Sequence, residues 1–403
     1  LVTDIQPMLE KIPMELRPPT LDDSVSDLDR LRRGLAQKGV DTGRLSIGLK
    51  VMRELAASMR DENWRITASI MHKSCSSEVV AVEPGDTSQS DMGMAIDIGT
   101  TTIVVYLVDM TDGQILAATS GHNRQSACGD DVINRIVCAE KNGVKKLSTL
   151  ALSTINTLIK EAVDGVGVDF NEIHNVVVSG NTTMTHLLLK IEPRYIRREP
   201  YIPSISEFPV LKSGNIGLKA NPNAAVFVMP GPASYVGGDI VSGILYSGLH
   251  REAEMTLFID VGTNGEIVLG NKDWLICASC SAGPAFEGGG IRWGMRAEEG
   301  AIEGVAIDRH TFDTSLKTIG DEPPRGICGS GMIELLSEMM LTGIIDQRGK
   351  FQLPADHSRL GAIGDEPAYI LAYADETPME EDLVYTESDI DNLLRSKGAV
   401  YAG

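Results

Sequence analysis

The sequence predicts an α/β protein with two lobes of related design. A strand–turn–strand pattern, IDIGTTT at residues 96–102, recurs as IDVGTNG at residues 259–265. Between residues 94 and 270, short apolar runs typical of buried strands alternate with stretches of helical period, an alternation that favours α/β architecture. The recurrence of the pattern indicates an internal duplication on the scale of a whole lobe.

Length and composition set limits on the chain. Its 403 residues exceed one typical domain, so we expect two or three. The net charge of −20 argues against a nucleic-acid partner. The sequence contains no apolar run of about 18 residues, the length that would predict a membrane span, and so we expect no membrane partner. The six cysteines form no dense disulfide pattern, which predicts a cytoplasmic protein. We expect both ends to be cut from a longer polypeptide.

The segment 1–90 differs from the rest and predicts a small α+β domain. Residues 16–35 have a Pro-Pro break and then apolar residues at helical spacing. Residues 64–71 and 76–84 predict two short strands. The polar stretch PGDTSQSD at residues 84–91 predicts a linker to the next domain.

The rest of the chain predicts a first lobe at 91–222 and a second at 223–403. We expect the strands of the first lobe at 94–99, 102–109, 114–120 and 174–180, and its helices at 129–141, 147–163 and 181–190. In the second lobe, we expect a strand at 224–231, a helix at 236–249, a strand–turn–strand at 255–270 and a helix within 388–403.

The two hairpins predict phosphate-binding loops. A glycine-rich turn between two strands presents backbone N–H groups, which bind phosphate oxygens without a cationic side chain. The first turn offers Gly99, for close backbone approach, and the hydroxyls of Thr100, Thr101 and Thr102. The second turn offers Gly262, Thr263, Asn264 and Gly265. Two ordinary hairpin turns are the alternative, and the recurrence of the pattern favours the phosphate sites.

Each hairpin follows a strand that carries one aspartate, Asp97 in the first and Asp260 in the second. The apolar run around Asp97 predicts a buried carboxylate. A carboxylate beside a polyphosphate would repel it unless a divalent cation lies between them. Mg²⁺ keeps several waters and takes one or two carboxylates plus phosphates. We therefore predict that both aspartates are catalytic and bind Mg²⁺ through water, and that the hairpins hold one nucleotide between them.

The two hairpins resemble the phosphate loops of the actin, Hsp70 and sugar-kinase superfamily of ATPases. That resemblance implies a ribonuclease-H-like sheet in each lobe. A longer series of motifs resembles the ATP-dependent reductive activators of corrinoid proteins. In order, the motifs are PPTLDDSVSDLDRL, WRITASI, VEPGD, DIGTTTIVVYLVD, GDDVINRI, SGNTTMTHLLL, YVGGDIVSGIL, IDVGTNGEIVL, SAGPAFEGGGIRWGM and RGICGSGMIELL. Members of this family are iron–sulfur proteins that reduce an inactive Co(II) corrinoid to Co(I).

This resemblance implies ATP and Mg²⁺ as cofactors, a corrinoid protein as partner, and a [2Fe–2S] cluster in the full-length protein. The C-x4-C-x2-C spacing of a plant-type cluster is absent here, so we expect no cluster in this chain. The superfamily's adenosine-binding Gly-Gly motif should follow a helix such as 387–402 and is absent too. Whether this chain binds nucleotide by itself, and whether it forms a homodimer, stay open.

Three further motifs each have a functional and a structural interpretation. Glu287 in GPAFEGGG would orient Mg²⁺ or the attacking water, or would cap a helix. Gly329 and Ser330 in RGICGSG would hold a nucleotide edge at a helix N-terminus, or would serve tight packing. Gly180 and Asn181 in SGNTTM would lie by resemblance at the junction of the lobes, while Asn181 is also a good helix cap.

Two smaller signals complete the sequence prediction. By resemblance, Asp131 in GDDVINRI would face the nucleotide, whereas Asp130 reads as a cap. Cys277-x2-Cys280 has the spacing of a metal half-site, but no partner pair completes it. We therefore interpret both as buried strand cysteines.

The sequence predicts ATP-dependent reductive activation of a corrinoid protein. Two alternatives remain open. One is a small-molecule kinase of the same superfamily, acting on a sugar or an acyl group. The other is a nucleotide-gated binding protein without redox activity.

Overall fold

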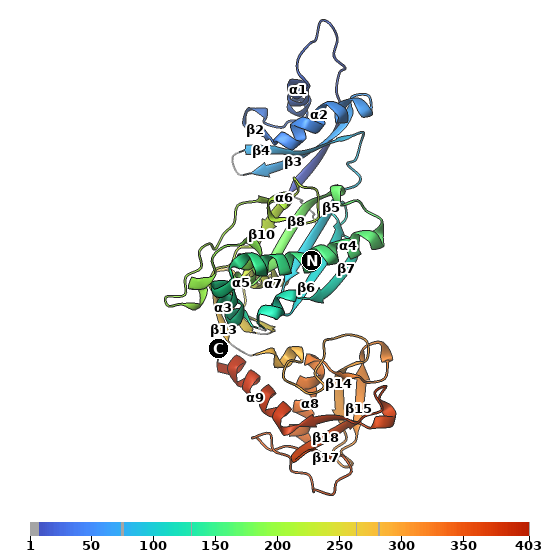
Figure 1. Cartoon of the computed structure of the whole chain (residues 1–403), viewed down its shortest axis with the longest axis vertical. Coiled ribbons are helices and arrows are strands. Elements are labelled where there is room, and N and C mark those ends of the chain that lie inside the picture. The colour runs from blue at the N-terminus through green and yellow to red at the C-terminus, as the bar shows by residue number, and fades with distance from the viewer. Residues whose placement is uncertain (1–7, 74–75, 130, 263, 281–282, 403) are drawn as a thin grey trace. The chain divides into compact units, whose positions relative to one another are not determined.

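The computed structural model describes residues 8–73, 76–129, 131–262, 264–280 and 283–402. The chain divides into two compact units, residues 1–247 and 248–403. Each unit is described by itself. Both combine helices with strands, as predicted (Figure 1).

The first part of unit 1 is a small α+β domain built on a four-stranded sheet of order β1-β3-β4-β2. Its strands are β1 (Leu9–Glu15), β2 (Leu45–Ile47), β3 (Arg65–Lys73) and β4 (Ser76–Pro84), and its helices are α1 (Asp27–Gln37) and α2 (Leu49–Asp61). Strands β3 and β4 and helix α1 confirm the prediction, and Ser26 caps α1 by accepting from the N–H of Asp29. Strands β1 and β2 and helix α2 were not predicted.

The predicted linker at residues 84–91 is held firmly to this domain. The ammonium of Lys11, on β1, pairs with Glu83 at 3.0 Å and donates to the carbonyl of Ser90 at 2.6 Å. Its side chain is only 6% exposed, so the ion pair lies largely out of water. On the far side of the linker, Asn175 donates to buried Asp91 at 3.2 Å. The linker is therefore pinned from both sides.

The second part of unit 1 is a six-stranded mixed sheet of order β7-β6-β5-β8-β10-β9. Its strands are β5 (Met92–Ile98), β6 (Thr102–Asp109), β7 (Ile115–His122), β8 (Ile173–Gly180), β9 (Leu211–Lys212) and β10 (Ala225–Val228). The lobe boundary expected at 222/223 falls inside this sheet, because β10 pairs in parallel with β8. The compact units meet at 247/248 instead.

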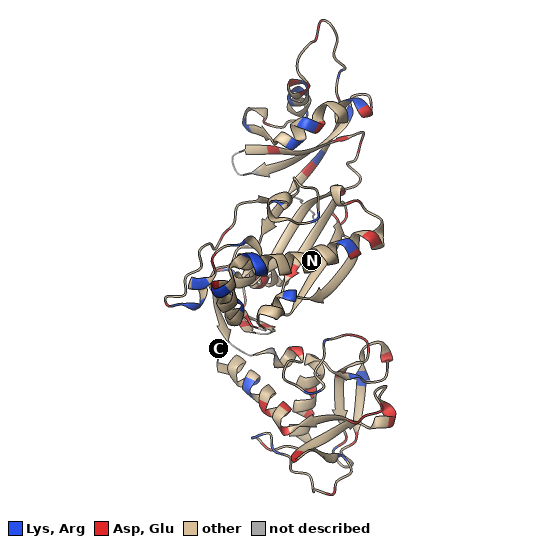
Figure 2. Ribbon diagram, viewed as in Figure 1, with Lys and Arg blue, Asp and Glu red and all other residues tan. Residues whose placement is uncertain are grey.

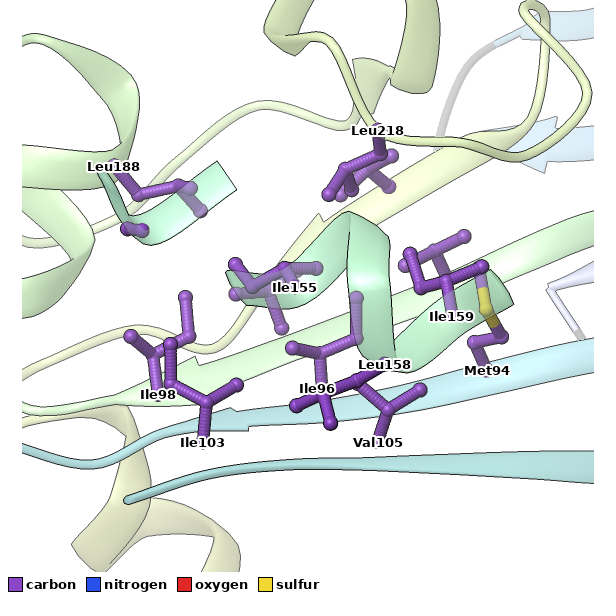
Figure 3. Packing of buried hydrophobic residues seen from close by; sticks show 14 of the residues in the cluster. Met94, Ile96, Ile98, Ile103, Val105, Ile155, Leu158, Ile159, Leu188 and Leu218 are labelled. Atoms are coloured by element: carbon purple, nitrogen blue, oxygen red, sulfur yellow. The ribbon is translucent and has the colours of Figure 1, made fainter. Parts of the chain in front are cut away.

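Helices pack against the six-stranded sheet. They are α3 (Val132–Asn142), α4 (Val144–Val166), α5 (Thr182–Leu189), α6 (Ser213–Ile216) and α7 (Gly238–Ser247). Figure 3 shows Ile155, Leu158 and Ile159 of α4 lying over Ile96 and Ile98 of β5. Burial of side chains of this size contributes about 1.5–3 kcal/mol each. The apolar spacing along α4 thus packs this helix on the sheet whose inner strands β5 and β6 are joined by the first hairpin.

Unit 2 contains three separate three-stranded sheets, of orders β11-β12-β13, β15-β14-β16 and β17-β18-β19. The strands are β11 (Thr256–Val261), β12 (Gly265–Gly270), β13 (Leu275–Cys280), β14 (Ala301–Ile307), β15 (Thr314–Thr318), β16 (Gly326–Ile327), β17 (Leu360–Ile363), β18 (Glu366–Ala372) and β19 (Leu383–Thr386). Helices α8 (Gly329–Thr342) and α9 (Glu387–Ala402) pack with them. The predicted strand pair at 255–270 and the helix at the end of the chain are confirmed.

Charged residues of both signs are interspersed along α1, α2, α4 and α9 (Figure 2). On α4, for example, Lys160 pairs with Asp164 one turn later, an arrangement that adds modestly to helix stability. No helix in the described ranges is both long and apolar enough to cross a membrane.

Candidate functional site

The first hairpin lies at the carboxyl end of β5, where Gly99, Thr100 and Thr101 join β5 to β6. Asp97 pairs in register with Val104 of β6 and Ser179 of β8. Its side chain is exposed rather than buried, which corrects the sequence prediction. Strand alternation explains the difference: Ile96 and Ile98 face the core, so Asp97 faces the other way.

Gly180 and Asn181 lie beside this hairpin, at the end of β8. A Cβ on Gly180 would come 2.8 Å from the carbonyl oxygen of Ile98, so only glycine fits there. Asn181 caps α5 by accepting from the N–H of Met184 at 3.0 Å, as predicted. Its amide also donates to the hydroxyl oxygen of Thr100 at 3.1 Å. Asn181 therefore both caps α5 and contacts the first hairpin.

A second asparagine, which the sequence reasoning missed, also donates hydrogen bonds to the first hairpin. Asn123 directly follows β7, and its side chain is fully buried. Its amide donates to the carbonyl of Gly99 at 2.9 Å, and its backbone N–H donates to the carbonyl of Thr101 at 2.8 Å. An asparagine after a strand signals a turn or a cap, and nothing in the local pattern connects it with a loop 24 residues earlier.

The second hairpin, in unit 2, joins β11 to β12. Within the turn, the N–H of Gly262 donates to the carbonyl of Asn264 at 2.9 Å. A Cβ on Gly265 would lie 2.8 Å from the sulfur of Cys280, so this glycine also serves packing against β13. Thr263, predicted to bind phosphate, lies outside the described residues.

Two carboxylates meet at the second hairpin. Asp260 is exposed to solvent on β11, but the protein atoms around its carboxyl group and, secondly, the negative charge of Glu287 raise its pKa. Glu287 comes so near the turn that its Oε1 would lie 3.7 Å from a Cβ placed on Gly262. The neighbouring carboxylate disfavours the ionised form of Asp260 unless a cation lies between the two acids.

The segment that carries Glu287 rests on the N-terminus of α8. Residues Pro284–Glu287 form a 3-10 turn, and a Cβ on Gly329 would lie 2.4 Å from the carbonyl oxygen of Phe286. Gly329 is thus the first residue of α8 and also the place of close contact with the turn. The hydroxyl of Ser330, in the first turn of α8, lies 3.4 Å from the sulfur of Cys328, the N-cap residue.

One of the two smaller predictions needs correction. Asp131 caps α3, accepting from the N–H of Asn134 at 2.7 Å, and its predicted place facing the nucleotide stays a prediction; Asp130 lies outside the described residues. Cys277 is exposed rather than buried, and the thiol of Cys280 donates to the carbonyl of Gly265 at 3.0 Å.

The candidate residues therefore gather in two places. In unit 1, the first hairpin is joined by Gly180, Asn181 and the newly found Asn123. In unit 2, Asp260 and the second hairpin are joined by Glu287 and, through Phe286, by Gly329. Each group combines a glycine-containing turn with at least one carboxylate, a composition suited to binding phosphate and a divalent cation.

Comparison with known families assigns the chain. Residues 2–89 match the RACo linker region, residues 92–252 match the RACo middle region, and residues 254–403 match the C-terminal domain of RACo, the ASKHA domain. The chain belongs to the RACo family. Both the suspected family and the α/β fold with an ASKHA domain are thereby confirmed.

Several proteins resemble this RACo chain along most of its length. A solved structure described as a reductive activator for a corrinoid, iron–sulfur protein is 45% identical, with a TM-score of 0.91 over 99% of this chain and 64% of that one. The corrinoid activation enzyme RamQ of Eubacterium limosum is 33% identical over 387 residues, which are 94% of this chain and 63% of RamQ. A [Co(II) methylated amine-specific corrinoid protein] reductase of Methanosarcina barkeri is 26% identical, over 63% of this chain and 52% of the reductase. The chain thus spans less than two thirds of these relatives.

Proposed function

We propose that this chain provides the ATP-dependent part of a reductive activator that returns a Co(II) corrinoid protein to Co(I). Support comes from its membership of the RACo family and from the relatives named as a corrinoid activator and a corrinoid protein reductase. The corrinoid protein is the substrate and partner in this proposal. A homodimer stays an untested prediction.

One observation carries the nucleotide part of the proposal: Asp260 and Glu287 converge beside the glycine turn of the second hairpin. Desolvation and, secondly, the negative charge of Glu287 raise the pKa of Asp260, and a bound Mg²⁺ would offset the repulsion between the two carboxylates. When bound, Mg-ATP would supply a cleavable phosphoanhydride. Its Mg²⁺ ion would carry the positive charge that the carboxylates and the phosphates both attract. We assign the other phosphate contacts to the turn of the first hairpin.

We assign the remaining residues the roles that the sequence motifs and the family resemblance imply. Asp97 and Asp260 would each hold a magnesium-bound water. Glu287 would orient that water or the attacking one. Side-chain and backbone groups that would face the nucleotide belong to Gly99, Thr100, Thr101, Thr102, Gly180, Asn181, Gly262, Thr263, Asn264, Gly265, Gly329 and Ser330.

A [2Fe–2S] cluster does not fit the residues of this chain. The sequence lacks the plant-type cysteine spacing. Across the described ranges, no three His, Cys, Asp or Glu side chains are grouped so that they could hold a metal ion. We therefore propose that the cluster lies elsewhere in the full-length protein, which we place in the cytoplasm.

ATP would act on cobalt reduction through coupling. A nucleotide that favours one arrangement of a two-lobed ATPase changes its affinity for a partner by the same factor that the partner changes nucleotide affinity. Such coupling typically amounts to about 1–3 kcal/mol. It would shift the balance of a reduction that is unfavourable with ordinary cellular donors.

The deciding experiment is anaerobic. The full-length protein, which would carry the cluster, is mixed with a Co(II) corrinoid protein and a low-potential one-electron reductant, with and without Mg-ATP, and the visible spectrum of Co(I) is followed. Co(I) that forms only when both the full-length protein and Mg-ATP are present supports the proposal. Hydrolysis of ATP without any change at cobalt, across several corrinoid proteins, contradicts it. Phosphorylation of a sugar or of acetate would then favour the kinase alternative.

Two variants test the site assignment. Asp97→Asn and Asp260→Asn should each abolish Mg-ATP hydrolysis and leave the fold intact, because each removes a negative charge from the magnesium site. Circular dichroism and the thermal midpoint report on the fold. Near-normal turnover in both variants would contradict the assignment.

A further inference from the structure

We infer that Asn123 is a positioning residue, which fixes the first hairpin so that the N–H of Thr100 points toward bound phosphate. The inference rests on the proposed function and extends it to a residue that contacts no substrate. It begins from the buried amide of Asn123, which donates to the carbonyl oxygen of Gly99 at 2.9 Å.

Peptide geometry links this carbonyl to the phosphate-binding group. The carbonyl of Gly99 and the N–H of Thr100 belong to one peptide unit, which is planar and trans, so the two groups point in opposite directions. Asn123 draws the carbonyl toward the protein interior. The N–H of Thr100 must therefore point away from Asn123, toward the outer side of the turn. Asn181 fixes the Thr100 side chain independently, at 3.1 Å.

Asn123 is itself held by a buried polar network. Its Oδ1 accepts from the backbone N–H of Gln125 at 3.1 Å. The Gln125 side chain donates to the carbonyl of Leu147 at 3.0 Å and accepts from Arg135 at 3.3 Å. Arg135 in turn donates to the carbonyl of Gly129 at 2.9 Å. All three side chains are fully buried, where ordered polar networks specify one arrangement.

The chemistry of the side chain explains why asparagine suits this place. One short planar amide offers an acceptor for the Gln125 N–H and a donor for the Gly99 carbonyl. Serine can keep the first role, since it is also a good cap, but it is too short for the second. Aspartate keeps the shape and the cap, yet offers no donor to the carbonyl.

The chain contains a matched control. Asn221 makes the same pair of contacts elsewhere in unit 1: its Oδ1 accepts from the N–H of Asn223 at 3.0 Å, and its amide donates to the carbonyl of Asn171 at 2.9 Å. Those contacts lie near the start of β8, whereas the first hairpin lies near its end. Asn221→Ser therefore removes a bond of the same type, at a more exposed position, without touching the hairpin.

The experiment measures binding of pyrophosphate and of ATP by calorimetry, in the presence of Mg²⁺. We expect Asn123→Ser and Asn123→Asp to weaken both ligands by about tenfold, the effect of one hydrogen bond to a charged group. We expect Asn221→Ser to bind both ligands as the unmodified chain does. A merely structural role for Asn123 would lower the thermal midpoint in the serine variants and leave both affinities unchanged, and that result would overturn the inference.

A second measurement needs no variant. Pyrophosphate should slow hydrogen exchange at the Thr100 amide of the unmodified chain, and unchanged exchange at saturation would overturn the inference. If the chain binds ATP while the Asn123 variants bind it equally well, the inference fails and the proposed function stands. If neither the chain nor the full-length protein binds either ligand, the proposed function fails and the inference falls with it.

Discussion

Gly329 and Phe286 lie so close together that a Cβ on Gly329 would stand 2.4 Å from the carbonyl oxygen of Phe286. The backbone oxygen cannot swing away as a side chain would. The contact seats the turn that carries Glu287 on the first residue of α8, and it ties the position of that acid to a helix end. The motifs GPAFEGGG and RGICGSG are distant in sequence, and this contact joins them in the folded chain.

A substitution at Gly329 should therefore disturb the site through the backbone. Gly329→Ala should force the turn away from α8, displace Glu287, and reduce Mg-ATP hydrolysis at least tenfold with a lower thermal midpoint. The control is Gly398→Ala in α9, where a Cβ meets nothing within 4 Å. That change should stabilise the helix by about 0.5–1 kcal/mol. Equal hydrolysis by the two variants would show that the close contact does not position Glu287.

The pH dependence of hydrolysis should report on the pair Asp260 and Glu287. The ionised form of Asp260 holds the magnesium site, and its raised pKa means that activity is lost as the pH falls through that value. Glu287→Gln removes one of the causes of the raised pKa, so the acid limb of the pH–rate profile should move to lower pH, even where the rate itself is reduced.

The control for this pH profile is Glu298→Gln, which changes the net charge equally at an exposed position of unit 2. It should leave the acid limb where it is. An acid limb that stays fixed in Glu287→Gln would show that the two carboxylates do not interact in solution.

Stability against pH should depend on two buried groups in unit 1 that act in opposite directions. Burial raises the pKa of Asp91 to about 6, so its contribution to stability is present at low pH and is lost as the pH rises through about 6. Burial lowers the pKa of His174 to about 4. Its contribution is present above the ordinary histidine pKa and is lost as the pH falls toward about 4.

Removing the titration of Asp91 should leave the pH dependence that His174 gives to the free energy of unfolding. In Asp91→Asn, the free energy of unfolding should rise from about pH 5 to about pH 7 by on the order of 1 kcal/mol more than in the unmodified chain. Urea denaturation at the two pH values measures this difference. Asp22→Asn, at an exposed position, is the control. A parallel pH dependence in all three proteins would contradict the role of Asp91.

The buried ion pair of Lys11 and Glu83 should show strong coupling. Lys11→Met leaves Glu83 partly buried without its partner, so we expect a loss of about 2–3 kcal/mol, near the lower end for breaking a buried pair. Lys11→Met combined with Glu83→Gln should lose less than the sum of the single changes, as a double-mutant cycle by urea denaturation would show. Lys160→Met, which breaks an exposed pair on α4, should change little. Additive single losses at Lys11 and Glu83 would argue against coupling.

Local patterns made much of this structure predictable. The apolar runs around the hairpins became β5, β6, β11 and β12, and Asn181 caps α5 because capping needs only residues three apart. Strand β1 escaped prediction since Pro13 interrupts its pattern. As an edge strand paired only with β3, β1 tolerates that proline.

Contacts between distant residues set the limit of prediction. Nothing near Asn123 in the sequence indicates Gly99 as its partner, and nothing near Asp260 indicates Glu287. The exposure of Asp97 depends on which face of β5 the helix α4 covers, and the lobe boundary depends on the pairing of β10 with β8. Each of these follows from tertiary packing, which an apolar pattern leaves undetermined.

The stretch at residues 84–91 has the composition of a flexible linker, but in the folded chain it is a fixed connection between two sheets. Lys11 of β1 binds Ser90 within this stretch and Glu83 of β4 just before it, and Lys212 of β9 pairs with Glu78 of β4 at 2.8 Å. Leu9, Met71 and Val80 from the small domain share an apolar cluster with Ala225 of β10. These contacts couple the two sheets of unit 1, so a rotation of the six-stranded sheet should move the four-stranded sheet with it.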